Sequence, residues 1–265
     1  MIRIVVIGYG AIGSDLVQRL ITKYGPELSL GVLLDKNSQT IEKLPKQVVH
    51  LADINSVKEY QPDLVIEAAG HQAVRAYAND CLEAGISFLI VSVGVLADDK
   101  LFSDLKSSAS KNNSKLILPS GAIGGMDYLR AASQVPNATV VYESRKPPKA
   151  WENELLGLGI SSPITEQIVI FEGDARTAAT KYPQNLNVAA VMSLAGIGFE
   201  KTQVRIVIDP DAKGNTHQIF LKGDFGEVKL NIQNRPSPDN PKTSWIVSLS
   251  IFAAIEQYLS PVIFM

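Results

Sequence analysis

Residues 2–13 of this 265-residue chain read IRIVVIGYGAIG and decide its fold. The run over 2–8 is apolar without alternation and rich in β-branched residues, which is typical of a strand covered on both faces of a parallel sheet. Residues 11–23 follow with apolar side chains on one helical stripe. The glycines therefore stand at a turn that leads from a strand into a helix, and they are Gly8, Gly10 and Gly13.

A G-x-G-x-x-G pattern in this setting indicates a dinucleotide-binding loop. Gly8 permits the tight turn, Gly10 lets the backbone approach a pyrophosphate, and Gly13 allows the helix to pack closely on the strand. The helix N-terminus offers N–H groups and about half a positive charge to the phosphates. The residues predicted here to bind the cofactor are Gly8, Gly10, Ala11, Ile12 and Gly13.

An acidic residue follows the second predicted strand, LSLGVLLD over residues 28–35. Asp35 stands where a dinucleotide fold places a carboxylate for the adenosine ribose hydroxyls, and this carboxylate favours NAD by repelling a 2′-phosphate. Lys36 is adjacent and can pair with such a phosphate, so the sequence leaves both NAD and NADP open. The alternative for Asp35 is an aspartate that only begins a loop.

Small residues follow a further predicted strand, DLVIEAAG over residues 63–70. In an open parallel sheet the ligand lies beyond the carboxyl ends of the strands. Ala69, Gly70 and His71 are therefore predicted to lie near the cofactor. We interpret His71 as a helix-start residue that the helix N-terminus keeps neutral, with an active-site base as the alternative.

Two domains and a final helix are predicted from the pattern of strands and helices. Residues 1–118 alternate the two, which predicts an α/β, Rossmann-type domain with a mostly parallel sheet. Residues 119–240 contain alternating strands such as EVKLNIQ at 227–233, typical of a mainly antiparallel sheet within an α+β domain. This second domain is the expected site of substrate binding, catalysis and oligomerisation. Residues 241–265 are predicted to form a helix that packs back on the domain boundary.

Several polar groups in the second domain are candidates for binding an anionic substrate or the cofactor. Lys146 belongs to a cluster of cations beside two prolines, where the alternative is ordinary surface charge. Asn187 lies in an apolar helical pattern and can hydrogen-bond a carboxamide. His217 lies on an apolar strand face, where a histidine is usually a core residue. The other candidates for a substrate carboxylate are Arg145, Lys149, Lys242, Thr243 and the amides of Gly121 to Gly125.

Composition excludes several classes of protein. Lys and Arg number 25 against 27 Asp and Glu, so no basic excess is available for nucleic acid. The single cysteine, Cys81, and three histidines leave little material for a disulfide or a metal cluster, so we expect no metal. The C-terminal apolar stretch carries Glu256 and is too polar for a spanning helix. We therefore expect a cytoplasmic protein without a membrane segment.

Taken together, these segments resemble the L-aspartate dehydrogenase family over nearly the whole chain. The residues that carry the resemblance are GYGAIG (8–13), EAAGHQAV (67–74), SVGVLAD (92–98), PSGAIGG (119–125), RKPP (145–148), YPQNLNVAA (182–190), DPDAKGNTHQI (209–219) and NPKTSW (240–245). The resemblance implies oxidation of L-aspartate to iminoaspartate with NAD or NADP, in support of NAD biosynthesis. It also implies that the protein forms a homodimer or a higher homo-oligomer.

The same resemblance implies roles for four residues. Ala122 and Asn187 would contact the cofactor, His217 would be the catalytic histidine, and Lys146 would be a substrate-binding or catalytic group. A histidine near its ordinary pKa suits the proton transfer that such a reaction needs. Two alternatives stay open at this point: a related two-domain amino-acid or semialdehyde dehydrogenase or reductase, and a dinucleotide-binding sensor without catalysis.

Overall fold

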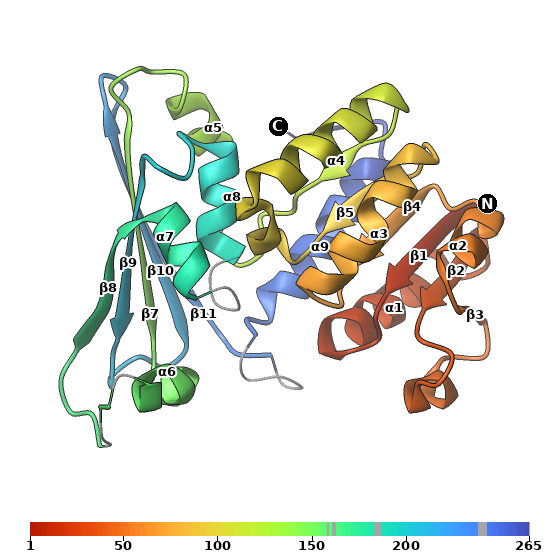
Figure 1. Ribbon diagram of the computed structural model, residues 1–265, viewed down its shortest axis with the longest axis horizontal. Coiled ribbons are helices and arrows are strands. Elements are labelled where there is room, and N and C mark those ends of the chain that lie inside the picture. Colours follow the sequence, from red (N-terminus) through yellow and green to blue (C-terminus); the bar gives the residue numbers. More distant parts are fainter. Residues whose placement is uncertain (158, 161–162, 183–186, 238–242, 265) are drawn as a thin grey trace. The chain divides into compact units, whose positions relative to one another are not determined.

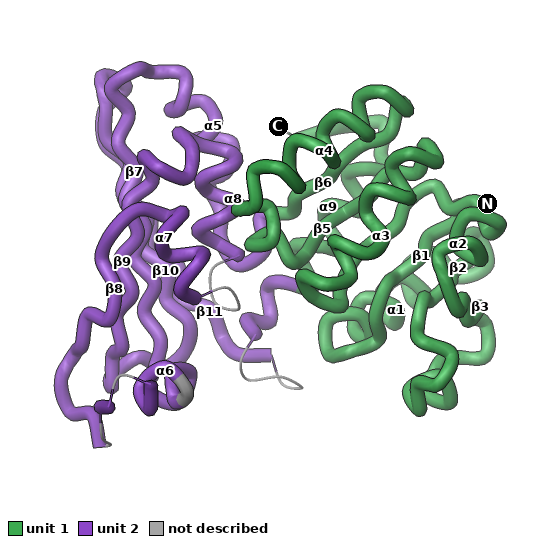
Figure 2. The backbone as a smooth tube through the Cα atoms, viewed as in Figure 1, with its two compact units in different colours: residues 1–119, 248–264 green, residues 120–247, 265 purple. Residues whose placement is uncertain are grey.

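The computed structural model describes residues 1–157, 159–160, 163–182, 187–237 and 243–264. Within them the chain forms two compact units (Figure 2). Unit 1 consists of residues 1–119 and 248–264, and unit 2 consists of the described part of 120–247. The C-terminal segment thus belongs to the same unit as the N-terminal strand.

Unit 1 is built on a six-stranded sheet in the order β3-β2-β1-β4-β5-β6, with every pairing parallel. The strands are β1 (Ile2–Ile7), β2 (Leu28–Leu33), β3 (Val48–Leu51), β4 (Leu64–Glu67), β5 (Ser87–Ile90) and β6 (Leu116–Ile117). The parallel α/β sheet that the sequence predicts is confirmed. The chain reverses its direction of travel across the sheet between β1 and β4, and this is where open α/β sheets bind ligands.

Helices cover both faces of this sheet (Figure 1). They are α1 (Ala11–Tyr24), α2 (Ile54–Tyr60), α3 (His71–Glu83), α4 (Asp99–Lys111) and α9 (Ile246–Leu259). Helix α3 contacts both α2 and α4. Helix α9 lies beside α1, where Glu256 pairs with Lys23 at 3.4 Å. None of the described helices is long and apolar enough to cross a membrane.

Unit 2 is built on a five-stranded sheet in the order β11-β10-β7-β9-β8. The strands are β7 (Thr139–Lys146), β8 (Ile168–Asp174), β9 (Thr202–Ile208), β10 (Asn215–Gly223) and β11 (Gly226–Asn234). The pair β7–β9 is parallel, whereas β11–β10, β10–β7 and β8–β9 are antiparallel. The sheet is thus mixed but mainly antiparallel, as expected from the alternating sequence.

One face of the second sheet is covered by helices and the other is not. Helices α5 (Met126–Ala132), α7 (Ala175–Lys181) and α8 (Asn187–Ala195) lie on one side (Figure 1), and a short α6 (Glu152–Gly157) follows β7. The apolar helical pattern that contains Asn187 corresponds to α8. On the opposite face, in the part of the chain that the structure describes, no helix covers the sheet, and Val141 and Phe220 are exposed there.

Side chains that accept backbone N–H groups determine where two local elements begin or end. Strand β5 ends at Ile90, and the N–H groups of the next two residues, Val91 and Ser92, bond to the carboxylate of Glu67. The sequence analysis missed α2. Asp53 begins that helix by accepting the Ser56 N–H, while the Ser56 hydroxyl accepts the Asp53 N–H, a reciprocal cap that stabilises a short helix.

Candidate active site

The glycine loop has the geometry that a dinucleotide requires. Gly8 adopts a φ of +91°, and a Cβ placed there would lie 2.8 Å from the Cβ of Ala69, so the loops after β1 and β4 touch. A Cβ on Gly13 would lie 2.3 Å from the carbonyl oxygen of Gly8. Gly10 has no neighbour within 4 Å of its Cβ position, which leaves room for a ligand against the backbone. These residues fit a pyrophosphate.

A buried carboxylate fixes the other loops at this edge of the sheet. Glu67, the last residue of β4, accepts the N–H groups of Ala69 at 2.8 Å and Gly70 at 2.6 Å on Oε1. Its Oε2 accepts the N–H groups of Val91 at 3.2 Å and Ser92 at 3.0 Å. The hydroxyl of Ser92 also donates to Oε1. Glu67 thus ties the loop after β4 to the loop after β5, although the sequence analysis did not single it out.

The remaining predicted cofactor residues of unit 1 lie at the same carboxyl edge. Ala11 and Ile12 are the first residues of α1, and His71 is the first residue of α3, with Gly70 before it at a φ of +108°. Asp35 is exposed two residues beyond β2, where its carboxylate accepts the N–H of Asn37 at 2.8 Å. This hydrogen bond leaves the second carboxylate oxygen available for a ribose hydroxyl.

His217 lies in unit 2 on the helix-covered face of β10. The side chain is buried, only 4% exposed, and it shares this face with Ile219 and Leu221. Its Nδ1 atom lies 2.7 Å from the hydroxyl of Tyr142 on β7. Within the described residues, its Nε2 atom has no hydrogen-bond partner, an uncommon state for a buried polar group. Nδ1 is therefore held by a hydrogen bond, and Nε2 is able to bind a ligand.

Lys146 lies on the same face of the sheet as His217. It is on β7, two residues beyond Ser144, which pairs directly with His217 across the strands. The side chain is only 8% exposed, and its Nζ atom lies 5.1 Å from the centre of the Trp151 ring. The structure therefore brings together the two residues predicted to be catalytic, with Ser144 and Trp151 as neighbours.

The electrostatics of this pair follow from burial. Burial, with the positive charge of Lys146 as a second cause, lowers the pKa of His217 to about 4. Burial likewise lowers the pKa of Lys146 to about 8, against an opposing effect of Glu154. At neutral pH the imidazole is therefore uncharged, beside a cation that an anionic ligand would stabilise. In the free protein the pKa of His217 thus lies below the ordinary value that the sequence analysis expected.

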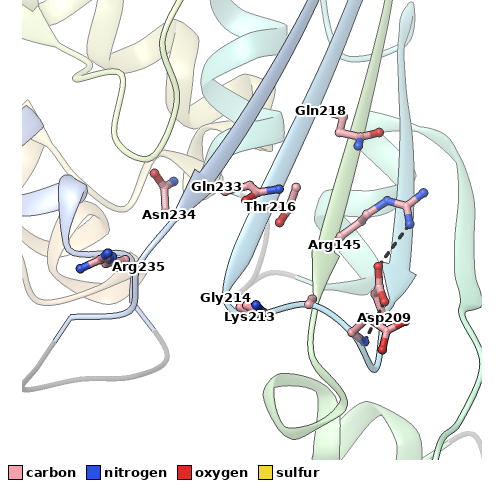
Figure 3. Close-up of a pocket in the computed structure, with 11 residues that line it drawn as sticks. Arg145, Asp209, Lys213, Gly214, Thr216, Gln218, Gln233, Asn234 and Arg235 are labelled. Atoms are coloured by element: carbon pink, nitrogen blue, oxygen red, sulfur yellow. Dashed lines mark hydrogen bonds and ion pairs between the residues drawn. The ribbon is translucent and has the colours of Figure 1, made fainter.

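Arg145 does not join this cluster. Strand alternation places it on the opposite face of the sheet, where it pairs with Glu143 and with Asp209. Figure 3 shows it beside a polar hollow of about 530 Å³ that Thr216 and Gln218 also line. Arg145 and Lys146 therefore do not share a face of the sheet, because adjacent residues of a strand point to opposite faces.

The other predicted residues of unit 2 lie at the ends of helices or in loops. Ala122 is buried, and its carbonyl accepts the Nδ2 group of Asn234 at 2.7 Å. Asn187 is the first residue of α8, and Gly125 precedes α5 with a φ of +76°. Lys149 is exposed in a short 3-10 helix. Lys242 lies outside the described residues. Those described residues contain no group of three or more His, Cys, Asp or Glu side chains that could hold a metal ion.

Comparisons with known proteins agree with this geometry. The family model "Homoserine dehydrogenase, NAD binding domain" matches residues 8–119, and "Aspartate dehydrogenase, C-terminal" matches residues 127–258. The chain is 43% identical over 259 residues to L-aspartate dehydrogenase 2 of Bordetella pertussis, covering 97% of both chains. This chain belongs to the aspartate dehydrogenase family. An L-aspartate dehydrogenase of Methanosarcina barkeri is 38% identical over 99% of this chain and 98% of its own length.

A solved structure of the aspartate dehydrogenase family has the same fold. The aspartate dehydrogenase of Thermotoga maritima superposes with a TM-score of 0.77 at 26% identity, and the match covers 100% of both chains. Membership of this family accounts for an NAD-binding loop in unit 1. In unit 2, the neutral imidazole of His217 and the buried ammonium of Lys146 share one face of the sheet.

Proposed function

We propose that this chain catalyses the NAD- or NADP-dependent oxidation of L-aspartate to iminoaspartate, which then hydrolyses to oxaloacetate and ammonia. One observation carries the assignment of residues: His217 and Lys146 are buried on the same sheet face, with the Nε2 atom of His217 unpartnered among the described residues. The substrate is taken from relatives named L-aspartate dehydrogenase, such as those of Bordetella pertussis and Methanosarcina barkeri, whose alignments cover 97% and 99% of this chain.

His217 is the base of the proposed reaction. The amine of aspartate is protonated at neutral pH, and it must lose that proton before its nitrogen lone pair can form the C=N bond. Nε2 of His217 accepts the proton and so acts as a general base. In other enzymes, general base catalysis raises the reaction rate by about 10²- to 10⁴-fold. NAD or NADP, when bound, supplies the hydride acceptor.

Lys146 is the cation that holds a carboxylate of the substrate. Burial disfavours its charge and lowers its pKa to about 8, and an incoming carboxylate reverses this effect. The negative charge of the same carboxylate raises the pKa of His217, which burial lowers in the free protein. Binding of a dicarboxylate therefore makes the base stronger at the moment it is needed. An uncharged substrate gains neither effect.

The cofactor residues complete the proposal. The glycine loop, from Gly8 to Gly13, holds the pyrophosphate and Asp35 holds the ribose, while Glu67 keeps the loop of Ala69 and Gly70 in place. His71 serves as the start of α3 close to this loop. By resemblance to the family, Ala122 and Asn187 also contact the cofactor.

The biological setting is part of the same proposal. Iminoaspartate is a precursor in NAD biosynthesis, and the protein acts in the cytoplasm, where the one cysteine, Cys81, stays a thiol.

The chain assembles as a homo-oligomer through the uncovered face of the second sheet. Phe220 and Val141, which pair across β10 and β7 on that face, are 36% and 37% exposed and supply apolar surface. Sedimentation of the purified protein tests this assembly.

A substrate panel tests the activity. L-aspartate, D-aspartate, L-glutamate and L-homoserine are each supplied with NAD and with NADP, and formation of the reduced nicotinamide is followed by absorbance. L-aspartate alone should reduce the cofactor at a substantial rate. Turnover of homoserine in preference to aspartate would instead indicate a related dehydrogenase, and NADH binding without turnover of any amino acid would indicate a sensor.

A further inference from the structure

The hydroxyl of Tyr142 is the hydrogen-bond partner of the His217 ring, and both side chains are buried. Tyr142 is 1% exposed, and its oxygen lies 2.7 Å from Nδ1. The two rings are inclined by only 16°, with centres 5.9 Å apart, so their planes are nearly parallel where the hydroxyl meets Nδ1. Such a contact fixes both the orientation of the ring and the position of its proton.

We propose that Tyr142 is a positioning residue that selects the tautomer of His217, with Nδ1–H donating to the tyrosine oxygen and Nε2 carrying the free lone pair. This inference rests on the proposed function, because only an unprotonated Nε2 can take a proton from the substrate amine. Nδ1 cannot take it, since it already carries a proton, which it donates to Tyr142.

The alternative tautomer would not serve the proposed reaction. If the tyrosine hydroxyl donated to Nδ1, the single proton of the neutral ring would reside on Nε2, and this atom could only donate. Proton transfer would then require the ring to lose one proton as it gained another. With Nδ1–H bonded to Tyr142, Nε2 accepts the substrate proton directly and the ring becomes an imidazolium with both N–H groups in place.

The environment of Tyr142 keeps its oxygen neutral throughout. Burial raises the pKa of the hydroxyl above its ordinary value, so it does not ionise at the pH of the reaction. A neutral acceptor orients the imidazole but stabilises the imidazolium less than an aspartate would. His217 thus remains uncharged until a carboxylate substrate arrives, which agrees with its low pKa in the free protein.

The position of the two residues in the sheet explains why this contact is firm. Tyr142 pairs directly with Ile219, and His217 pairs directly with Ser144, so Tyr142 and His217 are diagonal neighbours on one face of adjacent strands. Both backbones belong to the centre of the sheet, with β11 and β9 on either side. The hydrogen bond is therefore set by strand register and not by a loop.

Nitrogen NMR of the unmodified full-length protein tests the tautomer directly. The chain has three histidines, so a sample labelled with ¹⁵N only in histidine gives three ring systems. His50 is an internal standard, because its Nε2 lies 3.0 Å from the carbonyl oxygen of Leu34 and must carry the proton there. We expect opposite tautomers at pH 7, with the proton on Nδ1 in His217 and on Nε2 in His50. A proton on Nε2 of His217 would overturn the proposal.

The variant Tyr142→Phe tests the consequence. It should move the His217 proton toward Nε2, lower kcat for L-aspartate by about tenfold to a hundredfold, and leave the KM for aspartate within about threefold. Tyr182→Phe is the matched control, because Tyr182 is in the same unit and its hydroxyl donates to the carbonyl of Ile170. It should leave the tautomer of His217 and kcat unchanged.

The two experiments separate this inference from the proposed function. An unchanged tautomer and an unchanged kcat in Tyr142→Phe would refute the role of Tyr142 while the role of His217 could still stand. The expected tautomer in the wild-type protein, together with full activity of a His217→Ala variant, would refute the proposed base and leave the hydrogen bond as a structural feature. The wild-type spectrum decides the tautomer even if Tyr142→Phe does not fold.

Discussion

The Nζ atom of Lys146 lies 5.1 Å from the centre of the Trp151 ring, and the two side chains are 8% and 0% exposed. The attraction between a cation and the face of an aromatic ring offsets part of the hydration free energy that the cation loses on leaving water. This contact explains how a lysine can be retained on the buried face of the sheet.

The variant Lys146→Met should weaken aspartate binding without unfolding the protein. A charge-assisted hydrogen bond contributes about 1.5–3 kcal/mol, so the KM for L-aspartate should rise at least tenfold. The thermal midpoint should stay equal or rise, because a buried cation is removed. Steady-state kinetics and thermal melts measure both quantities. A KM within twofold of wild type would exclude Lys146 as the carboxylate ligand.

The burial of His217 predicts a pH dependence of stability. Its pKa is about 4 in the folded protein and 6.5 in an unperturbed chain. Between these values the unfolded state binds more protons, so the free energy of unfolding falls as the pH falls. From pH 7 to pH 5, this histidine should lower the free energy of unfolding by about 2 kcal/mol. Urea unfolding of wild type and His217→Gln at both pH values isolates the effect, and equal losses in the two proteins would contradict it.

The carboxylate of Glu67 should matter for both stability and cofactor binding. In Glu67→Gln the side-chain amide places N–H groups against backbone N–H groups, so at least one donor is unsatisfied. We expect a loss of about 1.5–3 kcal/mol in the free energy of unfolding and a weaker affinity for NADH. Glu83→Gln, an exposed change on α3, is the control and should alter neither. NADH binding as tight as in wild type would show that these loops do not depend on Glu67.

The glycine loop allows a test that separates folding from binding. Gly10 has a φ of −77°, and its Cβ position is open, so Gly10→Ala should fold normally yet bind NADH at least tenfold more weakly. Gly13→Ala should instead lower the thermal midpoint, because its Cβ would lie 2.3 Å from a carbonyl oxygen. Fluorescence titration and thermal melts distinguish the two. Unaltered NADH affinity in Gly10→Ala would argue against a pyrophosphate at this loop.

The sequence predicts the two sheets of the molecule better than its short helices and side-chain contacts. The apolar run before Gly8 and the alternation over 227–233 correctly predict one parallel and one mainly antiparallel sheet, because each pattern follows from which faces are buried. Short helices such as α2 escaped notice, since their stability comes from the Asp53–Ser56 cap more than from an apolar stripe.

The partners of the candidate catalytic residues depend on strand register, which a single sequence does not reveal. Tyr142 and His217 are 75 residues apart and meet only because β7 pairs with β10 in one register. Alternation along β7 was a usable signal that Lys146 and Arg145 face opposite ways. Glu67 carried no signal of its own, because a glutamate at the end of a strand is ordinarily exposed to solvent.

In the proposed reaction, Nε2 of His217 takes the proton from the amine of L-aspartate. The most direct measurement compares kcat of wild type and His217→Ala with saturating L-aspartate and cofactor, alongside the affinity of each protein for NADH. We expect kcat to fall by about 10²- to 10⁴-fold while the NADH affinity is unchanged. A kcat within threefold of wild type would contradict it.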